Sequence, residues 1–318
     1  MKKPFISVVI PVYNEERSVG PLYKEIKEVS NKLIKANRIS GFEVIFVNDG
    51  STDKTQEALE KMKKEESEKS LLRIIEFRRN FGKAEAYKAG FKLAKGDFVF
   101  TMDGDLQDNP QNIPDFIAKI YEGHDVVIGW KYERKDPISK TLPSKLFNAV
   151  LRKATGLRLH DFDNGYRCMK RDVLQYLEFY EGLFRHIPVL ANSKGFKVAE
   201  VKVNHRKRKF GKSKFGFSRL FKGFFDFITI QFLLSYLKRP LHFFGGVGSI
   251  LSLIGIIIAL YLTYLKLFVR EMIGGRPLLI FSVLMIIVGF QFVFFGLIGE
   301  MIANMSRKEK NYVIKRVI

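Results

Sequence analysis

The chain has 318 residues, a length that suggests about two structural units. Hydrophobic residues make up 47% of it, which excludes disorder as its main state. Lysine and arginine outnumber aspartate and glutamate by 54 to 33, and the resulting net charge of +21 favours an anionic partner: nucleic acid, an acidic membrane face or a phosphorylated substrate. Cys168 is the only cysteine, so an intrachain disulfide and a cysteine-rich metal site are both excluded.

The first part of the chain alternates short apolar runs with amphipathic segments. Residues 22–33 carry apolar side chains at spacings of 4, 3 and 4, and residues 53–70 are highly charged; both segments are predicted to be helices. Strands are predicted at 6–10, 42–47, 71–77, 98–102 and 126–129. Repeated strand–helix units predict an α/β fold with a largely parallel sheet covered on both faces. In such sheets ligands bind beyond the carboxyl ends of the strands.

Two long uncharged runs lie near the end of the chain. Residues 241–265 and 277–299, of 25 and 23 residues, contain no Lys, Arg, Asp or Glu. A bilayer core requires about 20 helical residues, so we expect an integral membrane protein with two spans. Basic residues flank the outer ends of this hairpin, and the first residues lead into a strand rather than a signal-peptide core. Both termini, and the first domain, are therefore expected on the cytoplasmic side of the cytoplasmic membrane.

A basic segment and an aromatic segment separate the two parts. Residues 202–214 hold seven Lys or Arg, one histidine and no acid, and residues 217–236 carry aromatic and apolar side chains at helical spacing. A soluble core helix would show the same spacing, but the position before a span favours a helix in the membrane interface. The predicted domains are 1–214, a juxtamembrane amphipathic helix at 215–239, and 240–318 with the transmembrane hairpin and a basic tail.

Two carboxylates follow the predicted strand 98–102. Asp103 and Asp105 at a strand's carboxyl end form a hard-oxygen site suited to Mg²⁺ or Mn²⁺, and Gln107 adds a neutral oxygen. An Asp-x-Asp sequence alone is common in loops. Its position after a buried strand is what makes it a candidate metal site.

Three further polar loops also follow predicted strands. They are Pro11–Glu16, Val47–Asp53 and Arg79–Lys83, and in a parallel sheet they can surround a nucleotide. Asp49 is suited to accept a hydrogen bond from a base N–H, and Tyr13 to flank the ring. Taken singly, Asp49 belongs to an ordinary turn sequence and Glu15 is an ordinary helix cap. Their order along the chain favours the nucleotide site.

These motifs together resemble glycosyltransferase family 2, which has the GT-A fold, and within it the polyprenyl-phosphate glycosyltransferases of dolichol-phosphate mannosyltransferase and bacterial undecaprenyl-phosphate glucosyltransferase type. The resemblance covers about residues 5–214, and the C-terminal hairpin matches the bacterial branch. Residues 102–110 are the most diagnostic match, with one departure, Asn109 inserted before the proline. The resemblance implies nucleotide contacts from Pro11, Tyr13, Glu15, Asp49, Lys83 and Asp103. It also implies that Asp103, Asp105 and Gln107 hold the metal and diphosphate, with Asp105 a catalytic residue.

A second acidic group lies at residues 159–168 and resembles the family segment that faces the transferred sugar. Asp161 or Asp163 is expected to serve as a catalytic carboxylate on the acceptor side, with Arg167 near phosphate; His160 and Cys168 are interpreted as structural. A general base is unnecessary, because a phosphate monoester with a second pKa near 6 is already largely ionised at neutral pH. The carboxylate would then position the acceptor or the sugar.

The acceptor phosphate requires cations, and several basic residues are candidates. Lys131, followed by Arg134, Lys135 and Lys145, lies where relatives carry arginines, so the exact correspondence stays open. Arg208, Lys212 and Lys214 resemble the family's basic stretch over the active site. The alternative for that stretch is lipid binding beside the membrane, at about 1 kcal/mol per cation.

The expected function is metal-dependent, inverting transfer of a sugar from a nucleotide diphosphate sugar, with uridine favoured over guanosine, to a polyprenyl phosphate. A processive polysaccharide synthase is the alternative, but its Gln-x-x-Arg-Trp motif is absent, because the only tryptophan, Trp130, follows a glycine. A non-catalytic basic membrane scaffold would leave the acidic loops unexplained. No nucleic-acid partner is expected, a homo-oligomer is left open, and the sugar is not predicted.

Overall fold

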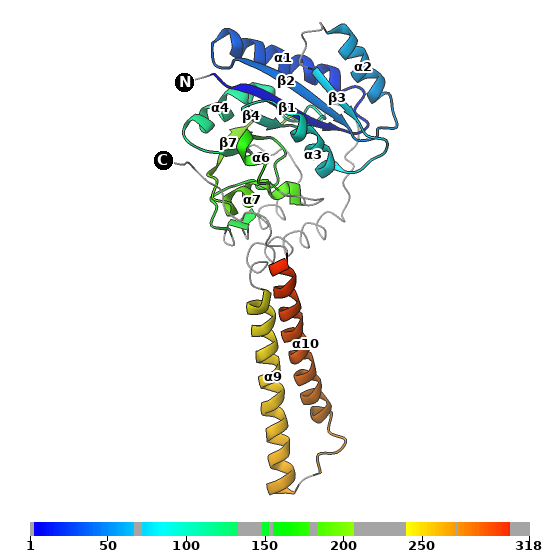
Figure 1. The fold of residues 1–318 in the computed structure, drawn as a ribbon, viewed down its shortest axis with the longest axis vertical. Coiled ribbons are helices and arrows are strands. Elements are labelled where there is room, and N and C mark those ends of the chain that lie inside the picture. The colour runs from blue at the N-terminus through cyan, green and yellow to red at the C-terminus, as the bar shows by residue number, and fades with distance from the viewer. Residues whose placement is uncertain are drawn as a thin grey trace. The chain divides into compact units, whose positions relative to one another are not determined.

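The computed structural model of the protein describes residues 3–66, 72–132, 148–149, 151–152, 155–177, 183–206, 240–270 and 272–305. The chain divides into two compact units, Met1–Asp226 and Phe227–Ile318 (Figure 1). The predicted boundaries after residues 214 and 239 fall at residues outside the described ranges and stay predictions, as does the interfacial helix at 215–239.

The first unit is built on a seven-stranded sheet in the order β3-β2-β1-β4-β6-β5-β7. The β1–β2, β2–β3, β1–β4 and β5–β7 pairs are parallel, whereas β6 runs antiparallel to both β4 and β5. The strands are β1 (Phe5–Val12), β2 (Gly41–Asn48), β3 (Leu72–Glu76), β4 (Phe98–Thr101), β5 (Val126–Lys131), β6 (Arg167–Lys170) and β7 (Val198–Val203). The prediction of a largely parallel sheet and of its first five strands is confirmed; β6 and β7 are additions.

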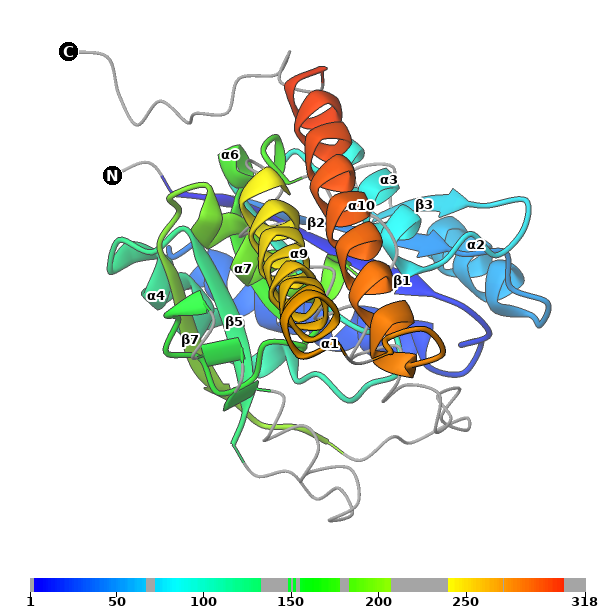
Figure 2. The same cartoon turned by 90° about the horizontal axis from the view of Figure 1, so that it is seen from below.

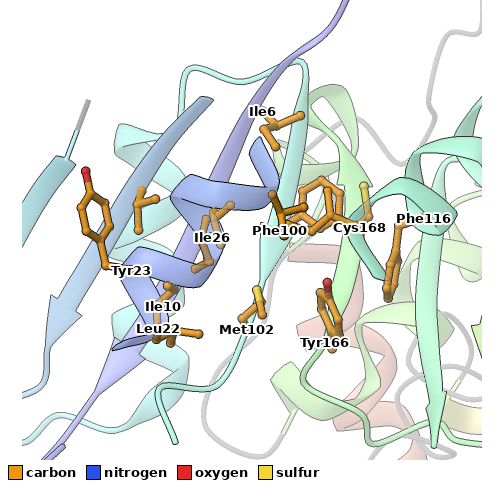
Figure 3. Packing of buried hydrophobic residues seen from close by; sticks show 14 of the residues in the cluster. Ile6, Ile10, Leu22, Tyr23, Ile26, Phe100, Met102, Phe116, Tyr166 and Cys168 are labelled. Atoms are coloured by element: carbon orange, nitrogen blue, oxygen red, sulfur yellow. The ribbon is translucent and has the colours of Figure 1, made fainter. Parts of the chain in front are cut away.

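Helices cover both faces of the sheet. The alternation of β1 sends Ile6 and Ile10 into the core on which α1 (Val19–Lys35) and α4 (Ile113–Tyr121) pack, as Figure 3 shows for α1. Val9 faces the other side, where α3 (Lys83–Leu93) packs against β1 and β2. The remaining helical elements of this unit are α2 (Thr55–Glu65), η1 (Pro110–Asn112), α6 (Arg171–Leu174), η2 (Leu183–His186) and α7 (Ile187–Ser193).

The apolar stripe predicted at residues 22–33 is the buried face of α1 and includes Leu22, Ile26, Val29 and Leu33. The charged helix predicted at 53–70 corresponds to α2, which is shorter and ends at Glu65; residues 67–71 lie outside the described ranges. The first of these helices follows from the spacing of its apolar side chains. The second buries Thr55 and Leu59 and begins where the Asp53 carboxylate accepts from the Thr55 N–H at 3.0 Å.

The second unit contains two long apolar helices. They are α9 (Pro240–Tyr264), which continues through a π-helical turn at Leu265–Val269, and α10 (Pro277–Met305). The helices lie side by side in both views (Figures 1 and 2), and a Cβ added at Gly248 would come within 2.5 Å of the Gly289 carbonyl oxygen. At about 1.5 Å per residue each helix exceeds 30 Å, so both are long and apolar enough to cross a bilayer.

Candidate active site

The loops that follow β1 and β2 are joined by hydrogen bonds at the carboxyl edge of the sheet. The Asn14 N–H donates to Ser51 Oγ at 2.9 Å, and the Thr52 N–H donates to Asn14 Oδ1 at 2.8 Å. Asn14 adopts a left-handed backbone conformation (φ +56°), which asparagine tolerates better than most residues. Hydrogen bonds therefore hold the loops after β1 and β2 together, and the two loops form the rim of the candidate site.

Asp49 ties the loop after β3 to this rim. Its carboxylate accepts hydrogen bonds from the Phe81 N–H at 2.7 Å and the Gly82 N–H at 3.0 Å, and the residue is only 5% exposed. These two bonds fix the Asp49 carboxylate at the ends of both loops. The structure thus gives Asp49 a role in loop organisation that the sequence does not reveal.

The other residues predicted to bind nucleotide lie on the same edge. Pro11 pairs with Val47 in the parallel register of β1 and β2, and Tyr13 is half-buried two residues later. The Glu15 carboxylate accepts from Ser18 Oγ at 3.0 Å, at the start of α1. The structure brings these side chains to one rim; their contacts with a nucleotide stay predictions.

The acidic motif forms a tight loop directly after β4. The Asp103 N–H donates to Asp108 Oδ2 at 3.1 Å, and the Gln107 N–H donates to Asp105 Oδ1 at 3.1 Å. Between them Leu106 has φ +65°, a conformation that is costly for a branched side chain. The loop is therefore held in one shape by its own carboxylates, with local backbone strain at its centre.

Lys83 connects the third loop to the acidic motif. It is the first residue of α3, and its ammonium forms an ion pair with the Asp103 carboxylate. Burial opposes ionisation of Asp103, yet the Lys83 ammonium holds the pKa of that carboxyl below its ordinary value. Burial likewise opposes the charge on Lys83, but Asp103 raises the pKa of Lys83 above its usual range. Both groups are therefore charged at neutral pH.

Asp108 has the opposite electrostatic environment. Burial and the neighbouring Asp103 carboxylate raise the pKa of Asp108 to about 7. Its side chain is 5% exposed and accepts from the Asp103 main chain. Asp108 thus helps to hold the backbone of this loop in place through its hydrogen bond with the Asp103 N–H. The sequence alone does not distinguish this role from the roles of Asp103 and Asp105.

The segment after β7 returns to the acidic motif. The Nε2 atoms of Gln107 and His205 lie 3.2 Å apart, and the Arg206 N–H donates to the Gln107 carbonyl at 2.9 Å. Arg206 Nη2 donates to Asn109 Oδ1 at 2.6 Å, so the residue that departs from the family pattern anchors this segment. His205 was not predicted to lie at the site, because in the sequence it is one residue of the basic segment 202–214 and has no distinguishing pattern.

The second acidic group lies around Arg167, which is fully buried. Its Nη1 and Nη2 donate to the carbonyl oxygens of Phe184 and Arg185 at 2.7 and 3.0 Å, and burial lowers its pKa. Asp163 lies 3.7 Å from Arg185 Nε, whereas Asp161 is 2% exposed. In this conformation Arg167 holds the main chain of η2 in place, so its predicted contact with phosphate stays a prediction and requires rearrangement.

Of the predicted acceptor-phosphate residues, the structure describes Lys131 and Arg167. Lys131 ends β5, and its positive charge lowers the pKa values of both Asp103 and Asp108. Lys145, Arg208 and Lys214 lie outside the described residues, as do Arg134, Lys135 and Lys212.

Residues 7–177 match the family model described as glycosyl transferase family 2. Over 98% of its length the chain is 33% identical to the dodecaprenyl-phosphate galacturonate synthase of Rhizobium johnstonii, of which it covers 92%. Identity and coverage are similar, at 33% over 98% of the chain and 93% of the relative, for the undecaprenyl-phosphate 4-deoxy-4-formamido-L-arabinose transferase of Yersinia enterocolitica.

Among solved structures, the glucosyl-3-phosphoglycerate synthase of Mycobacterium tuberculosis, crystallised with Mn²⁺, UDP and phosphoglyceric acid, is 22% identical. The TM-score is 0.48 over 64% of this chain and 72% of that one, a likeness too weak to place a ligand here. The family match spans more than half of the chain, and the two curated relatives align over nearly all of it. The chain therefore belongs to glycosyl transferase family 2, as the motifs of its loops predict, and is an enzyme of the glycosyltransferase class.

Proposed function

We propose that the protein transfers a sugar from a nucleoside diphosphate sugar, with uridine as the nucleoside, to the phosphate of a polyprenyl lipid. The observation that carries this proposal is the similarity, over 98% of the chain, to two enzymes named as polyprenyl-phosphate sugar transferases. The gathering of Asp49, Lys83 and Asp103 at one sheet edge supports it, because donor and acceptor must meet at a single centre.

The donor would lie along the rim formed by the loops after β1, β2 and β3. The Asp49 carboxylate would accept a hydrogen bond from a base N–H, and Tyr13, two residues beyond Pro11, would contact the ring. The Lys83 ammonium would exchange its contact with Asp103 for a diphosphate oxygen, since a lysine head group moves freely on its stem.

A divalent cation, Mg²⁺ or Mn²⁺, would be held by Asp103, Asp105 and Gln107, whose oxygens suit a hard ion. His205 is a further candidate ligand, because it lies beside Gln107. Within the described ranges no three His, Cys, Asp or Glu side chains converge as a metal cluster. This composition fits an ion that takes its remaining ligands from substrate phosphates and water. When bound, such an ion would offset the charge that develops on the leaving diphosphate.

The reaction would be a single displacement with inversion. A phosphate oxygen of the acceptor bonds to the anomeric carbon while the bond from that carbon to the diphosphate oxygen breaks on the opposite face. The acceptor is already ionised at neutral pH, so no side chain needs to remove a proton. Lys131, whose charge acts on Asp103, would attract the acceptor phosphate, and Asp163 beside Arg185 would orient the sugar or the acceptor.

The membrane arrangement follows from the two substrates. A polyprenyl tail lies in the bilayer, whereas nucleotide sugars are made in the cytoplasm, so the proposal requires the first unit on the cytoplasmic face. The apolar helices α9 and α10 would anchor it there.

The test is a transfer assay with the full-length protein in detergent, undecaprenyl phosphate and a panel of uridine and guanosine diphosphate sugars, read by mass spectrometry. One sugar per lipid phosphate, with the anomeric configuration inverted, is the expected product. Long glycan chains would instead indicate a processive synthase, and failure to glycosylate the lipid phosphate with every donor would refute the acceptor.

A pair of matched variants separates the metal motif from general effects of lost negative charge. Asp105→Ala should abolish metal-dependent transfer while leaving the fold intact. Asp172→Ala removes an exposed carboxylate of α6 and should retain wild-type activity. Equal activity in the two variants would contradict the role of Asp105.

A further inference from the structure

A cavity of about 520 Å³ lies in the first unit, away from the acidic motif, and is rich in positive charge. Its lining residues are Ala149, Arg152, Gly156, Leu157, Arg158 and His160. Within the described part of the chain, neither Arg152 nor Arg158 makes an ion pair or a side-chain hydrogen bond. Two guanidinium groups that line one cavity repel each other, so an anion between them would be stabilised.

The local backbone brings the two arginines to the same cavity. The Gly156 N–H donates to the Arg152 carbonyl at 2.9 Å, and Gly156 has φ +71°, a left-handed conformation that ends a helical turn. Arg158 follows two residues later along the chain. The guanidinium is planar and offers paired N–H groups, which match the oxygens of a phosphate.

The third polar wall, His160, is fixed by two neighbours. Its imidazole stacks on Trp130, with ring centroids 4.0 Å apart and an angle of 13° between the planes. Its Nδ1 contacts one oxygen of Glu200, and its main-chain N–H donates to the other at 2.6 Å. Glu200 is therefore engaged by His160 through both oxygens, and neither of the two arginines pairs with it in the part of the chain that the structure describes.

None of the residues that line this cavity belongs to the acidic motif. Trp130 and Lys131 are consecutive in β5, and successive side chains of a strand point to opposite faces. Lys131 acts electrostatically on Asp103 and Asp108, whereas Trp130 stacks on His160 at the cavity. A ligand between Arg152 and Arg158 would therefore not be the phosphate that reacts at the acidic motif.

We propose that the Arg152–Arg158–His160 cavity is a second, non-catalytic site that binds the phosphate group of a phosphodiester headgroup. The volume exceeds that of one phosphate, and Ala149 and Leu157 supply apolar contact for the carbon atoms attached to it. Free phosphate and an anionic lipid headgroup share this chemistry, and the experiment distinguishes these two sources.

Trp130 is the chain's only tryptophan and reports on this cavity through its stack with His160. We would titrate the full-length protein in neutral detergent with inorganic phosphate, and in phosphatidylcholine nanodiscs with or without phosphatidylglycerol, and follow tryptophan emission. Saturable emission changes with both phosphate and phosphatidylglycerol identify a lipid headgroup site, and a change with free phosphate alone identifies a soluble ligand. Unchanged emission in every arm would overturn the proposal.

The variants are Arg152→Ala/Arg158→Ala and, as a control of equal charge, Lys35→Ala/Arg38→Ala at the end of α1. The cavity variant should bind phosphate at least about tenfold more weakly, and the control should bind as the wild type does. Equally weakened phosphate binding in both variants would show that binding depends on net charge alone and would overturn the assignment to the cavity. Arg158 is exposed and Arg152 half-buried, so both variants should fold; a wild-type Tm and unliganded emission spectrum verify this.

Discussion

Gly165→Ala is a direct test of the position of Asp103. A Cβ at residue 165 would lie 2.8 Å from Asp103 Oδ1, closer than the 3.0 Å below which real Cβ contacts essentially never occur. The Gly165 backbone cannot easily retreat, because its carbonyl oxygen accepts from Thr101 Oγ1 at 2.6 Å, on β4. The Asp103 carboxylate must therefore move by several tenths of an ångström, which would also disturb its ion pair with Lys83.

A displacement of about 1 Å at a reacting centre can cost about 100-fold in turnover, so a shift of several tenths of an ångström should cost up to about tenfold. We expect kcat/KM of Gly165→Ala to fall by about that factor, with a higher Mg²⁺ or Mn²⁺ concentration needed for half-maximal activity. Stability should fall by no more than the loss of the Lys83–Asp103 ion pair, about 1–2 kcal/mol, since the new methyl group meets a partly exposed carboxylate rather than the core. The assay is lipid-product formation over a metal titration, alongside a thermal melt.

Gly20→Ala is the matched control. Gly20 lies in the first turn of α1, where an added Cβ meets nothing within 4 Å, so activity should match wild type and stability should rise by up to about 1 kcal/mol. If Gly165→Ala shows the turnover and metal dependence of Gly20→Ala, Asp103 does not act from the position described and the assignment of the metal motif fails.

Three further outcomes can be measured. Lys83→Met should lower the free energy of unfolding by about 1–2 kcal/mol at pH 7, a value between those for losing an exposed and a buried ion pair. The control Lys88→Met, which loses an ion pair at the surface, should lower it by at most about 0.5 kcal/mol. Because Lys83 holds the pKa of Asp103 low in the folded state, the loss in Lys83→Met should shrink as the pH falls below about 4; a constant loss in denaturant titrations would exclude the ion pair as its cause. Chelation should abolish transfer, and Mg²⁺ or Mn²⁺ should restore it; persistent activity would remove the metal from the mechanism. A reporter after Ile318 should be cytoplasmic and one near Gly274 external, and the reverse pattern would separate the enzyme from its donor.

The carboxyl-edge loops could be predicted because parallel topology itself brings them together. Once strands 6–10, 42–47 and 98–102 are placed in one parallel sheet, Asp49 and Asp103 must share an edge. The two apolar helices could be predicted for a similar reason, since the absence of charge over more than 20 residues is a local property. In both cases the signal lies within a short stretch of sequence.

The antiparallel strand β6 could not be predicted in the same way. Its sequence, Arg167–Lys170, begins and ends with a basic residue, and its pairing with β4 and β5 joins segments far apart in the chain. Arg167 looks like a surface cation in sequence, yet β6 buries it completely, and main-chain carbonyls of η2 accept its hydrogen bonds. By contrast, the alternation around Glu200 and Lys202 in β7 is a usable strand signal that would also have placed His205 near the edge.

Lys83 links the loop held by Asp49, where we propose that the nucleoside binds, to Asp103 of the proposed metal site. It directly follows Gly82, whose N–H binds Asp49, and its ammonium pairs with Asp103. A change at Asp49 acts on the first of these connections, so it should weaken donor binding while leaving the half-maximal metal concentration nearly unchanged. A change at Lys83 acts on both, because the same ammonium balances Asp103 and is available for a donor phosphate. Lys83→Met should therefore change both the donor KM and the half-maximal metal concentration. A change in only one of these two quantities would place the Lys83 charge outside the diphosphate site.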